Sequence, residues 1–172
     1  SELFIVFDCE GDNFRHRILP SYKSNRKEKP KELFAIKKEI YSFLTQYNFA
    51  FQISDDCEAD DLIASYVAQN PDKKVNVFTG DADLGALVNE NVSLLLEKKQ
   101  KINVVTPSNF HYFFQVPPNR LAEFKALQGD KSDFVKGVEG LFRNETVHLF
   151  MEFNSIHDFF EQGTKHYLFP KL

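Results

Sequence analysis

The sequence predicts an α/β domain with a mainly parallel, twisted sheet flanked by helices. Short apolar runs with the length of buried strands alternate with segments in which apolar residues recur at the helical period. Such alternation is typical of β-α-β units, whose strands run parallel. The chain has 172 residues, of which 42% are hydrophobic, and this is enough for a domain with a sizeable core.

The predicted elements follow this pattern in order along the chain. In the first part we expect a strand at 3–7, a long loop or partly helical arch at 9–30, a helix at 31–47, a strand at 49–53 and a helix at 59–68. The helix at 31–47 is amphipathic, and its apolar face consists of Leu33, Ile36, Ile40, Phe43, Leu44 and Tyr47.

The later part continues the alternation and then becomes helical. We expect strands at 75–78, 92–96 and 102–105, a charged turn at 97–101, and helices at 83–88, 107–114 and 117–127. The carboxyl-terminal third is predicted to be helical. No apolar run approaches the length of a membrane span, so we expect a cytoplasmic protein without membrane contacts, and a monomer.

The net charge of −4 conceals a strongly basic segment. Residues 15–38 contain nine basic and two acidic side chains, whereas the rest of the chain contains 12 basic and 23 acidic ones. A basic segment beside acidic clusters suits a polyanion that the first holds and metals on the second cleave. An ordinary solvated, charged face is the alternative interpretation of this segment.

Seven carboxylates form three short clusters, and an eighth, Asp8, follows the first predicted strand. The clusters are Glu58, Asp60 and Asp61; Asp81 and Asp83; and Asp130 and Asp133. Carboxylates held close together repel one another, so their convergence predicts divalent cations, and two such ions promote attack on a phosphodiester. Asp8 and Asp81 follow strands, where parallel sheets bind ligands. The first cluster has a simpler alternative, which is favourable placement of acids at the start of a helix.

Ordered motifs over about three quarters of the chain resemble the 5′-3′ exonuclease and flap endonuclease family, which includes the nuclease domain of bacterial DNA polymerase I. The matching segments are Phe4-Ile5-Val6-Phe7-Asp8, Phe14-Arg15-His16, Tyr22-Lys23-Ser24-Asn25-Arg26, Glu58-Ala59-Asp60-Asp61, Thr79-Gly80-Asp81-Ala82-Asp83-Leu84 and Leu127-Gln128-Gly129-Asp130-Lys131-Ser132-Asp133. The resemblance implies a PIN-like fold over residues 1–128 and structure-selective cleavage of DNA with a free 5′ end or 5′ flap.

The resemblance also implies roles for individual residues. Two Mg²⁺ or Mn²⁺ ions would be held by Asp8, Glu58, Asp60 and Asp61 on one side and by Asp81, Asp83, Asp130 and Asp133 on the other. Lys23 and Arg26 match a Tyr-Lys-x-x-Arg motif and would contact the scissile phosphate, as the charge of the transition state requires. Tyr22 would stack on the terminal base. Further DNA contacts would come from Arg15, Lys131, Gly137 and Gly140.

Two departures from the family pattern stand out. The family begins with another strand, which bears a metal-binding Asp in an apolar-Asp-Gly-Asn motif, and no such motif precedes Leu3. The family's glycine-rich hairpin between two helices is degenerate in residues 129–172. Phe134 and Lys136 replace Asn and Pro, and residues 137–142 keep only two glycines, Gly137 and Gly140. These changes weaken the expectation of duplex anchoring and of K⁺ binding.

Two other functions compete with cleavage of DNA. Asp81 and Asp83 after a strand superficially fit a haloacid-dehalogenase-like phosphatase, which needs a nucleophilic Asp and an acidic Asp two residues later. That hypothesis leaves the first acidic cluster and the basic segment unexplained. A non-catalytic nucleic-acid-binding remnant of the family is the second alternative, because of the two departures.

Overall fold

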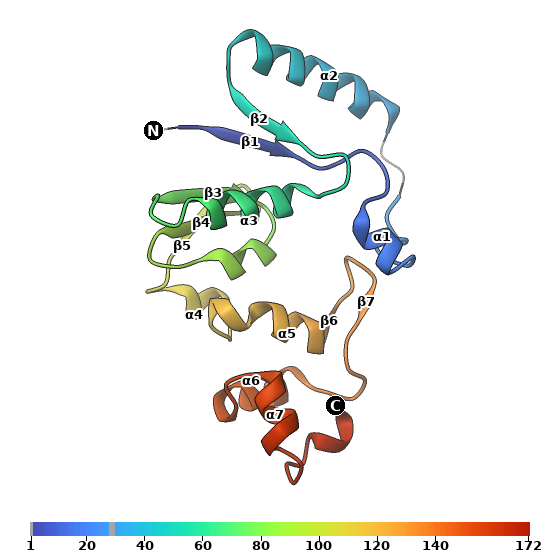
Figure 1. The fold of residues 1–172 in the computed structure, drawn as a ribbon, viewed down its shortest axis with the longest axis vertical. Coiled ribbons are helices and arrows are strands. Elements are labelled where there is room, and N and C mark those ends of the chain that lie inside the picture. The colour runs from blue at the N-terminus through green and yellow to red at the C-terminus, as the bar shows by residue number, and fades with distance from the viewer. Residues whose placement is uncertain (1, 28–29) are drawn as a thin grey trace. The chain divides into compact units, whose positions relative to one another are not determined.

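The computed structural model describes residues 2–27 and 30–172 (Figure 1). The chain forms two compact units, of which the first ends at Tyr66 and the second begins at Val67. Part of the arch predicted at 9–30 lies outside the described residues, at positions 28–29. The predicted boundary at residue 128 separates a PIN-like domain from a helical part and is not the boundary between these compact units. It stays a prediction.

The first unit is built on two parallel strands. β1 (Phe4–Phe7) and β2 (Ala50–Ile53) pair with Phe4 opposite Ala50 and Phe7 opposite Ile53. Between them the chain forms α1 (Phe14–Ile18), several turns and α2 (Lys31–Gln46). Asn48 after α2 has a φ of +53°, a conformation that Asn tolerates and that ends a helix, so the chain turns directly into β2. Both predicted strands and the long helix are confirmed.

Helices cover both faces of this strand pair (Figure 1). On one face Tyr41 of α2 lies edge-on to Phe7 at 4.8 Å between ring centroids and is stacked on Phe51 at 5.8 Å. On the other face Tyr66 of α3 (Ala59–Gln69) lies 5.2 Å from Phe4. Strand side chains alternate between faces, so adjacent apolar residues serve the two helices.

The predicted apolar face of α2 is only partly buried, which corrects the expectation for this helix. Leu44 is 5% exposed, whereas Ile36 and Phe43 are about half exposed. The helix contacts the sheet through Tyr41 as well as Leu44. A pair of strands is narrower than the apolar stripe of a 16-residue helix, so the rest of that stripe stays at the surface.

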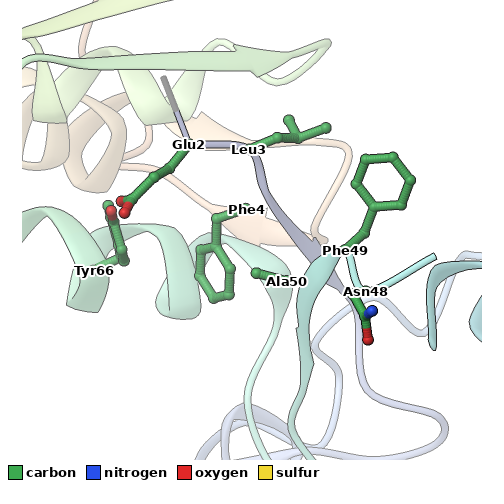
Figure 2. Close-up of a pocket in the computed structure, with 7 residues that line it drawn as sticks. All are labelled: Glu2, Leu3, Phe4, Asn48, Phe49, Ala50 and Tyr66. Atoms are coloured by element: carbon green, nitrogen blue, oxygen red, sulfur yellow. The ribbon is translucent and has the colours of Figure 1, made fainter. Parts of the chain in front are cut away.

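An open pocket of about 520 Å³ lies where β1 begins and α2 leads into β2 (Figure 2). Its lining residues are Glu2, Leu3, Phe4, Asn48, Phe49, Ala50 and Tyr66. Figure 2 shows Leu3 directed away from Phe4, as alternation along a strand requires. None of these seven residues belongs to the acidic clusters or to the basic motif.

The second unit contains a three-stranded sheet. β3 (Val75–Thr79) pairs in parallel with β4 (Val92–Lys98), which pairs antiparallel with β5 (Lys101–Val105). Alternate residues Val92, Leu94 and Leu96 of β4 are at most 3% exposed. Lys99 and Gln100 both have positive φ, as the two central residues of a type I′ β-turn require. The three predicted strands and the charged turn are confirmed.

The helical segments of this unit lie where they were predicted, but two are partly or wholly 3₁₀ helices and one is shorter. Asp83–Leu87 is a 3₁₀ helix, and a second 3₁₀ turn, Pro118–Arg120, precedes α5 (Leu121–Gln128). The helix expected at 107–114 is reduced to α4 (Phe110–Phe113). The Asn109 side chain accepts from the Thr106 amide at 2.8 Å and donates to the Val104 carbonyl at 2.9 Å. These bonds satisfy the backbone in a turn and delay the helix.

The carboxyl-terminal part packs two helices against α5. α6 (Arg143–Glu152) and α7 (Ile156–Gln162) enclose a core of Leu127, Leu141, Leu149, Phe159 and Leu168. Along the chain, α5 and α6 are joined by a short hairpin that was not predicted, formed by β6 (Gly129–Asp130) and β7 (Val135–Lys136). The backbone at Gly137 crosses close to the backbone at the end of α5. A Cβ on Gly137 would lie only 2.4 Å from the backbone carbonyl carbon of Gln128.

Gly137 and Gly140, which follow the hairpin, provide a stability prediction. A methyl group on Gly137 would collide with backbone atoms, whereas one on Gly140 would meet open space but carry a φ of +75°. We expect Gly137→Ala to lower the free energy of unfolding by about 3 kcal/mol and Gly140→Ala by roughly 1 kcal/mol. Urea unfolding followed by circular dichroism measures both. A loss at Gly140 equal to or larger than that at Gly137 would contradict the close crossing.

Candidate active site

Glu58 forms the centre of a buried hydrogen-bond cluster in the first unit. Glu58 is 8% exposed. Its carboxylate accepts hydrogen bonds from Asn13 Nδ2 at 2.9 Å, Tyr22 Oη at 3.1 Å and Lys23 Nζ at 2.7 Å. Burial raises the pKa of Glu58, but the hydrogen bond and charge of Lys23 outweigh it, so the pKa lies below its ordinary value. Two residues predicted to contact DNA, Tyr22 and Lys23, therefore form hydrogen bonds with Glu58, which is a predicted metal ligand.

Lys23 reaches this position from a left-handed backbone conformation. Its φ is +54°, which is uncommon for a residue other than glycine. The turn is fixed by a hydrogen bond from the Arg26 amide to the Lys23 carbonyl at 2.9 Å. The ammonium group also lies 5.0 Å from the centre of the Tyr22 ring. Arg26 itself has an exposed side chain.

A second ion pair in this unit joins Asp61 and Arg15. The guanidinium donates to both carboxylate oxygens, at 2.6 and 2.8 Å. Asp61 Oδ2 also accepts from the Glu58 amide at 3.0 Å and so closes the first turn of α3. The hydrogen bond from Arg15 is the main reason that the pKa of Asp61 lies below its ordinary value. Bidentate pairing holds the carboxylate in one orientation.

Asp8 and Asp60 flank this arrangement. Asp8 Oδ1 accepts from the Ala59 amide at 3.0 Å, so the first unit uses it as an acceptor at the start of α3. Asp60 lies in the first turn of the same helix, where an acidic side chain interacts favourably with the helix dipole. Favourable placement of acidic residues at the start of a helix therefore explains part of this cluster, and the contacts with Arg15 and Lys23 explain the rest.

The acidic residues of the second unit meet at one lysine that the sequence did not single out. Lys125 of α5 forms ion pairs with Asp83 Oδ1 and with Asp130 Oδ2, the second at 2.6 Å. Asp130 Oδ1 accepts from the Ser132 amide at 2.8 Å and from its hydroxyl at 2.5 Å. Burial raises the pKa of Asp130, but Lys125 and Ser132 together place it far below its ordinary value.

The pKa of Asp83 lies above its ordinary value, in contrast to that of Asp130. Burial raises the pKa of Asp83, and the charges of Asp81 and Asp130 act in the same direction, while Lys125 opposes them. Asp81 Oδ1 accepts from the Asp83 amide at 2.8 Å, which places the two residues in one turn after β3. This turn follows the carboxyl end of a parallel strand, as the sequence predicted.

Other predicted residues surround the hairpin of β6 and β7. Lys131 is exposed and Asp133 half-buried in the turn between the two strands. The carbonyl of Gly140 accepts from Lys171 Nζ at 3.0 Å, and Gly137 lies at the close crossing described above. Asn13 and Lys125 were missed by sequence reasoning. Asn13 had a detectable signal, since Asn before an apolar residue is a common helix start, and here it caps α1.

The donor atoms suit a hard divalent cation. Within residues 2–27 and 30–172, no group of three His, Cys, Asp or Glu side chains is already arranged around one point. Asp83 and Asp130 nevertheless direct carboxylate oxygens at a single cationic atom, Lys125 Nζ. Oxygen ligands converging on one positive charge fit Mg²⁺ or Mn²⁺. Four of the predicted ligands, Glu58, Asp61, Asp83 and Asp130, each form an ion pair with a basic side chain of their own unit.

Comparison with known proteins identifies relatives by sequence. The family profile described as "5′-3′ exonuclease, N-terminal resolvase-like domain" matches residues 1–115. The 5′-3′ exonuclease of Mycoplasmopsis pulmonis is 33% identical over 160 residues, covering 92% of this chain and 54% of the relative. The thermostable DNA polymerase I of Thermus filiformis is 31% identical over 157 residues, covering 88% and 18%. The chain spans about half the length of the first relative.

Solved structures share the fold. Bacteriophage T5 flap endonuclease in a complex with DNA and metal ions has a TM-score of 0.76 at 22% identity, covering 94% of this chain and 64% of that one. The catalytic core of Rad2 with a DNA substrate has a TM-score of 0.62 at 16% identity, covering 95% and 51%. These likenesses show the PIN-like α/β fold that the sequence predicted.

Among the described residues, no helix has the length and apolar character needed to cross a bilayer. The profile match covers well over half of the chain, and sequence relatives and fold agree. The chain belongs to the 5′-3′ exonuclease family.

Proposed function

We propose that this chain is a nuclease that hydrolyses phosphodiester bonds of DNA at a free 5′ end or 5′ flap and depends on divalent cations. The observation that carries the proposal is the contact between Lys23, expected at the scissile phosphate, and Glu58, expected at a metal, inside one buried cluster. A nuclease needs both groups at the same phosphate. Family membership supports the same activity.

The proposed ligands of two Mg²⁺ or Mn²⁺ ions are divided between the two units. Asp8, Glu58, Asp60 and Asp61 would hold one ion, and Asp81, Asp83, Asp130 and Asp133 the other. When bound, such ions activate water and polarise the phosphate. Proteins with this fold have been crystallised with metal ions, including bacteriophage T5 5′-exonuclease with zinc.

The basic side chains would then act on the phosphate. A divalent ion at Glu58 would neutralise the carboxylate that now holds Lys23 at 2.7 Å, and the ammonium would become available to the scissile phosphate. Charge on the phosphate is greatest in the transition state, so a cation there lowers the barrier. Arg26, exposed one turn later, would share this role.

Other DNA contacts follow from positions on the two units. Arg15 and Lys131 would contact phosphates, and Gly137 and Gly140 would offer backbone groups. Tyr22 is 8% exposed and donates to Glu58, so stacking on a terminal base would require its ring to move outward. We infer a monomer that acts in the cytoplasm, in DNA replication or repair.

The phosphatase alternative is disfavoured by the state of its acidic aspartate. Asp83, which would have to donate a proton, is paired with Lys125. The family match adds to this argument. A non-catalytic DNA-binding remnant is the remaining alternative, and metal-dependent turnover of a 5′-flap substrate separates it from a nuclease.

Lys23→Ala tests the phosphate clamp. We expect the single-turnover rate on a 5′-flap substrate to fall by roughly 100-fold or more, because the charge is needed most in the transition state. DNA affinity should fall less. Lys74→Ala is the matched control. This exposed lysine donates to the Glu90 carbonyl and lies outside the basic motif. Equal losses of rate and affinity would assign Lys23 to simple phosphate binding.

Asp130→Asn tests the metal ligands of the second unit. The amide retains an oxygen that can accept from Ser132, so the free energy of unfolding should change by only about 1 kcal/mol. Cleavage with Mg²⁺ or Mn²⁺ should fall by at least about 100-fold. Glu145→Gln, which alters an ion pair with Lys171 in the same unit, is the control and should retain activity. Full activity of Asp130→Asn would remove Asp130 from the site.

The degenerate hairpin makes a prediction about duplex DNA. Lys171 already supplies a cation at the Gly140 carbonyl, so we expect little advantage of K⁺ over Na⁺. Fewer phosphate contacts should also give a shallow fall of duplex affinity with salt. Titrations of a blunt duplex and a 5′-flap in KCl and in NaCl at matched ionic strength measure both. Tight duplex binding with a clear potassium advantage would contradict this expectation.

A further inference from the structure

Lys125 bridges two aspartates that come from distant parts of the second unit. The ammonium group on α5 forms ion pairs with Asp83, at the start of the 3₁₀ helix, and with Asp130 of β6, at 2.6 Å. The three side chains are between 19% and 38% exposed. The contact therefore lies close to the surface, where an ion from solution could reach it.

The lysine offsets the repulsion between the two carboxylates. Both direct an oxygen at one nitrogen atom, so their charges lie close together. The ammonium group of Lys125 lies between them and supplies the opposite charge. A cation is thus favoured at this point whether or not metal is present.

A divalent ion ligated by the same two oxygens would need the space that the ammonium group takes. We propose that Lys125 is an internal counter-ion that holds Asp83 and Asp130 together in the metal-free protein and competes with a divalent cation for them. This inference rests on the proposed function, because it takes both aspartates as metal ligands. Lys125 acts through them and is a positioning residue, since its side chain leaves their oxygens when the ion binds.

Binding of Mn²⁺ to Lys125→Met, followed by the electron paramagnetic resonance signal of the free ion, tests the competition. Without the ammonium group the ion has no competitor, so we expect Mn²⁺ to bind about fivefold more tightly than to the wild type at low salt. In EDTA the variant should unfold at a lower temperature than the wild type, because the aspartates are left to repel. Added Mn²⁺ should raise that temperature more in the variant.

Two control variants separate charge from structure. Lys125→Arg keeps the positive charge and should bind Mn²⁺ within about twofold of the wild type. Lys171→Met removes a lysine from its ion pair with Glu145 and should leave Mn²⁺ affinity unchanged. If Lys125→Met does not fold in EDTA, Lys125→Gln provides the same neutral charge with a polar head group. Recovery of folded protein on addition of Mn²⁺ would then support the competition.

Weaker or unchanged Mn²⁺ binding in both neutral variants would overturn the inference, as would the lack of Mn²⁺ binding in the wild type and the variants alike. A cleavage assay on the 5′-flap distinguishes this failure from failure of the proposed function. Cleavage by the wild type with unchanged Mn²⁺ affinity in Lys125→Met would refute the counter-ion alone. Tighter Mn²⁺ binding in the variant without cleavage by the wild type would refute the nuclease alone.

Discussion

The pairing of carboxylates with basic side chains is the interaction on which the site depends. Glu58 is buried, and a buried charge is tolerated only with a partner and additional hydrogen bonds. Lys23, Asn13 and Tyr22 supply these bonds. In the second unit Lys125 serves Asp83 and Asp130 in the same way. Each unit can therefore fold with two of its predicted metal ligands already paired with a basic side chain, Glu58 and Asp61 in the first unit and Asp83 and Asp130 in the second.

This pairing links the fold to the proposed chemistry. The basic side chains arise from segments that also shape the backbone: Arg15 lies in α1 and Lys23 in a left-handed turn, and both reach the start of α3. A divalent ion that takes over the carboxylates would release positive charge where a phosphate needs it. The same contacts that stabilise the metal-free protein would thus provide cations for an anionic substrate.

The sequence predicted the elements with strong local signals. β1 and β4 were predicted from short apolar runs and α2 from its helical period, and all three are confirmed. The roles that the family motifs give to the carboxylates stay predictions. Other features depend on contacts that are distant in the chain. Asn109 shortens a predicted helix through its side chain, and the outer stripe of α2 is left uncovered by a narrow strand pair. Lys125 meets Asp83 across 42 residues, a contact that no local pattern indicates.

Cleavage of a 5′-flap DNA by the purified chain, measured with increasing Mg²⁺ and again with EDTA, tests the central claim most directly. The account predicts shortened DNA products that accumulate with Mg²⁺, disappear with EDTA and return when Mn²⁺ is added in excess. Intact DNA under all conditions, together with retained binding to the flap, would show a binding protein and contradict a metal-dependent nuclease.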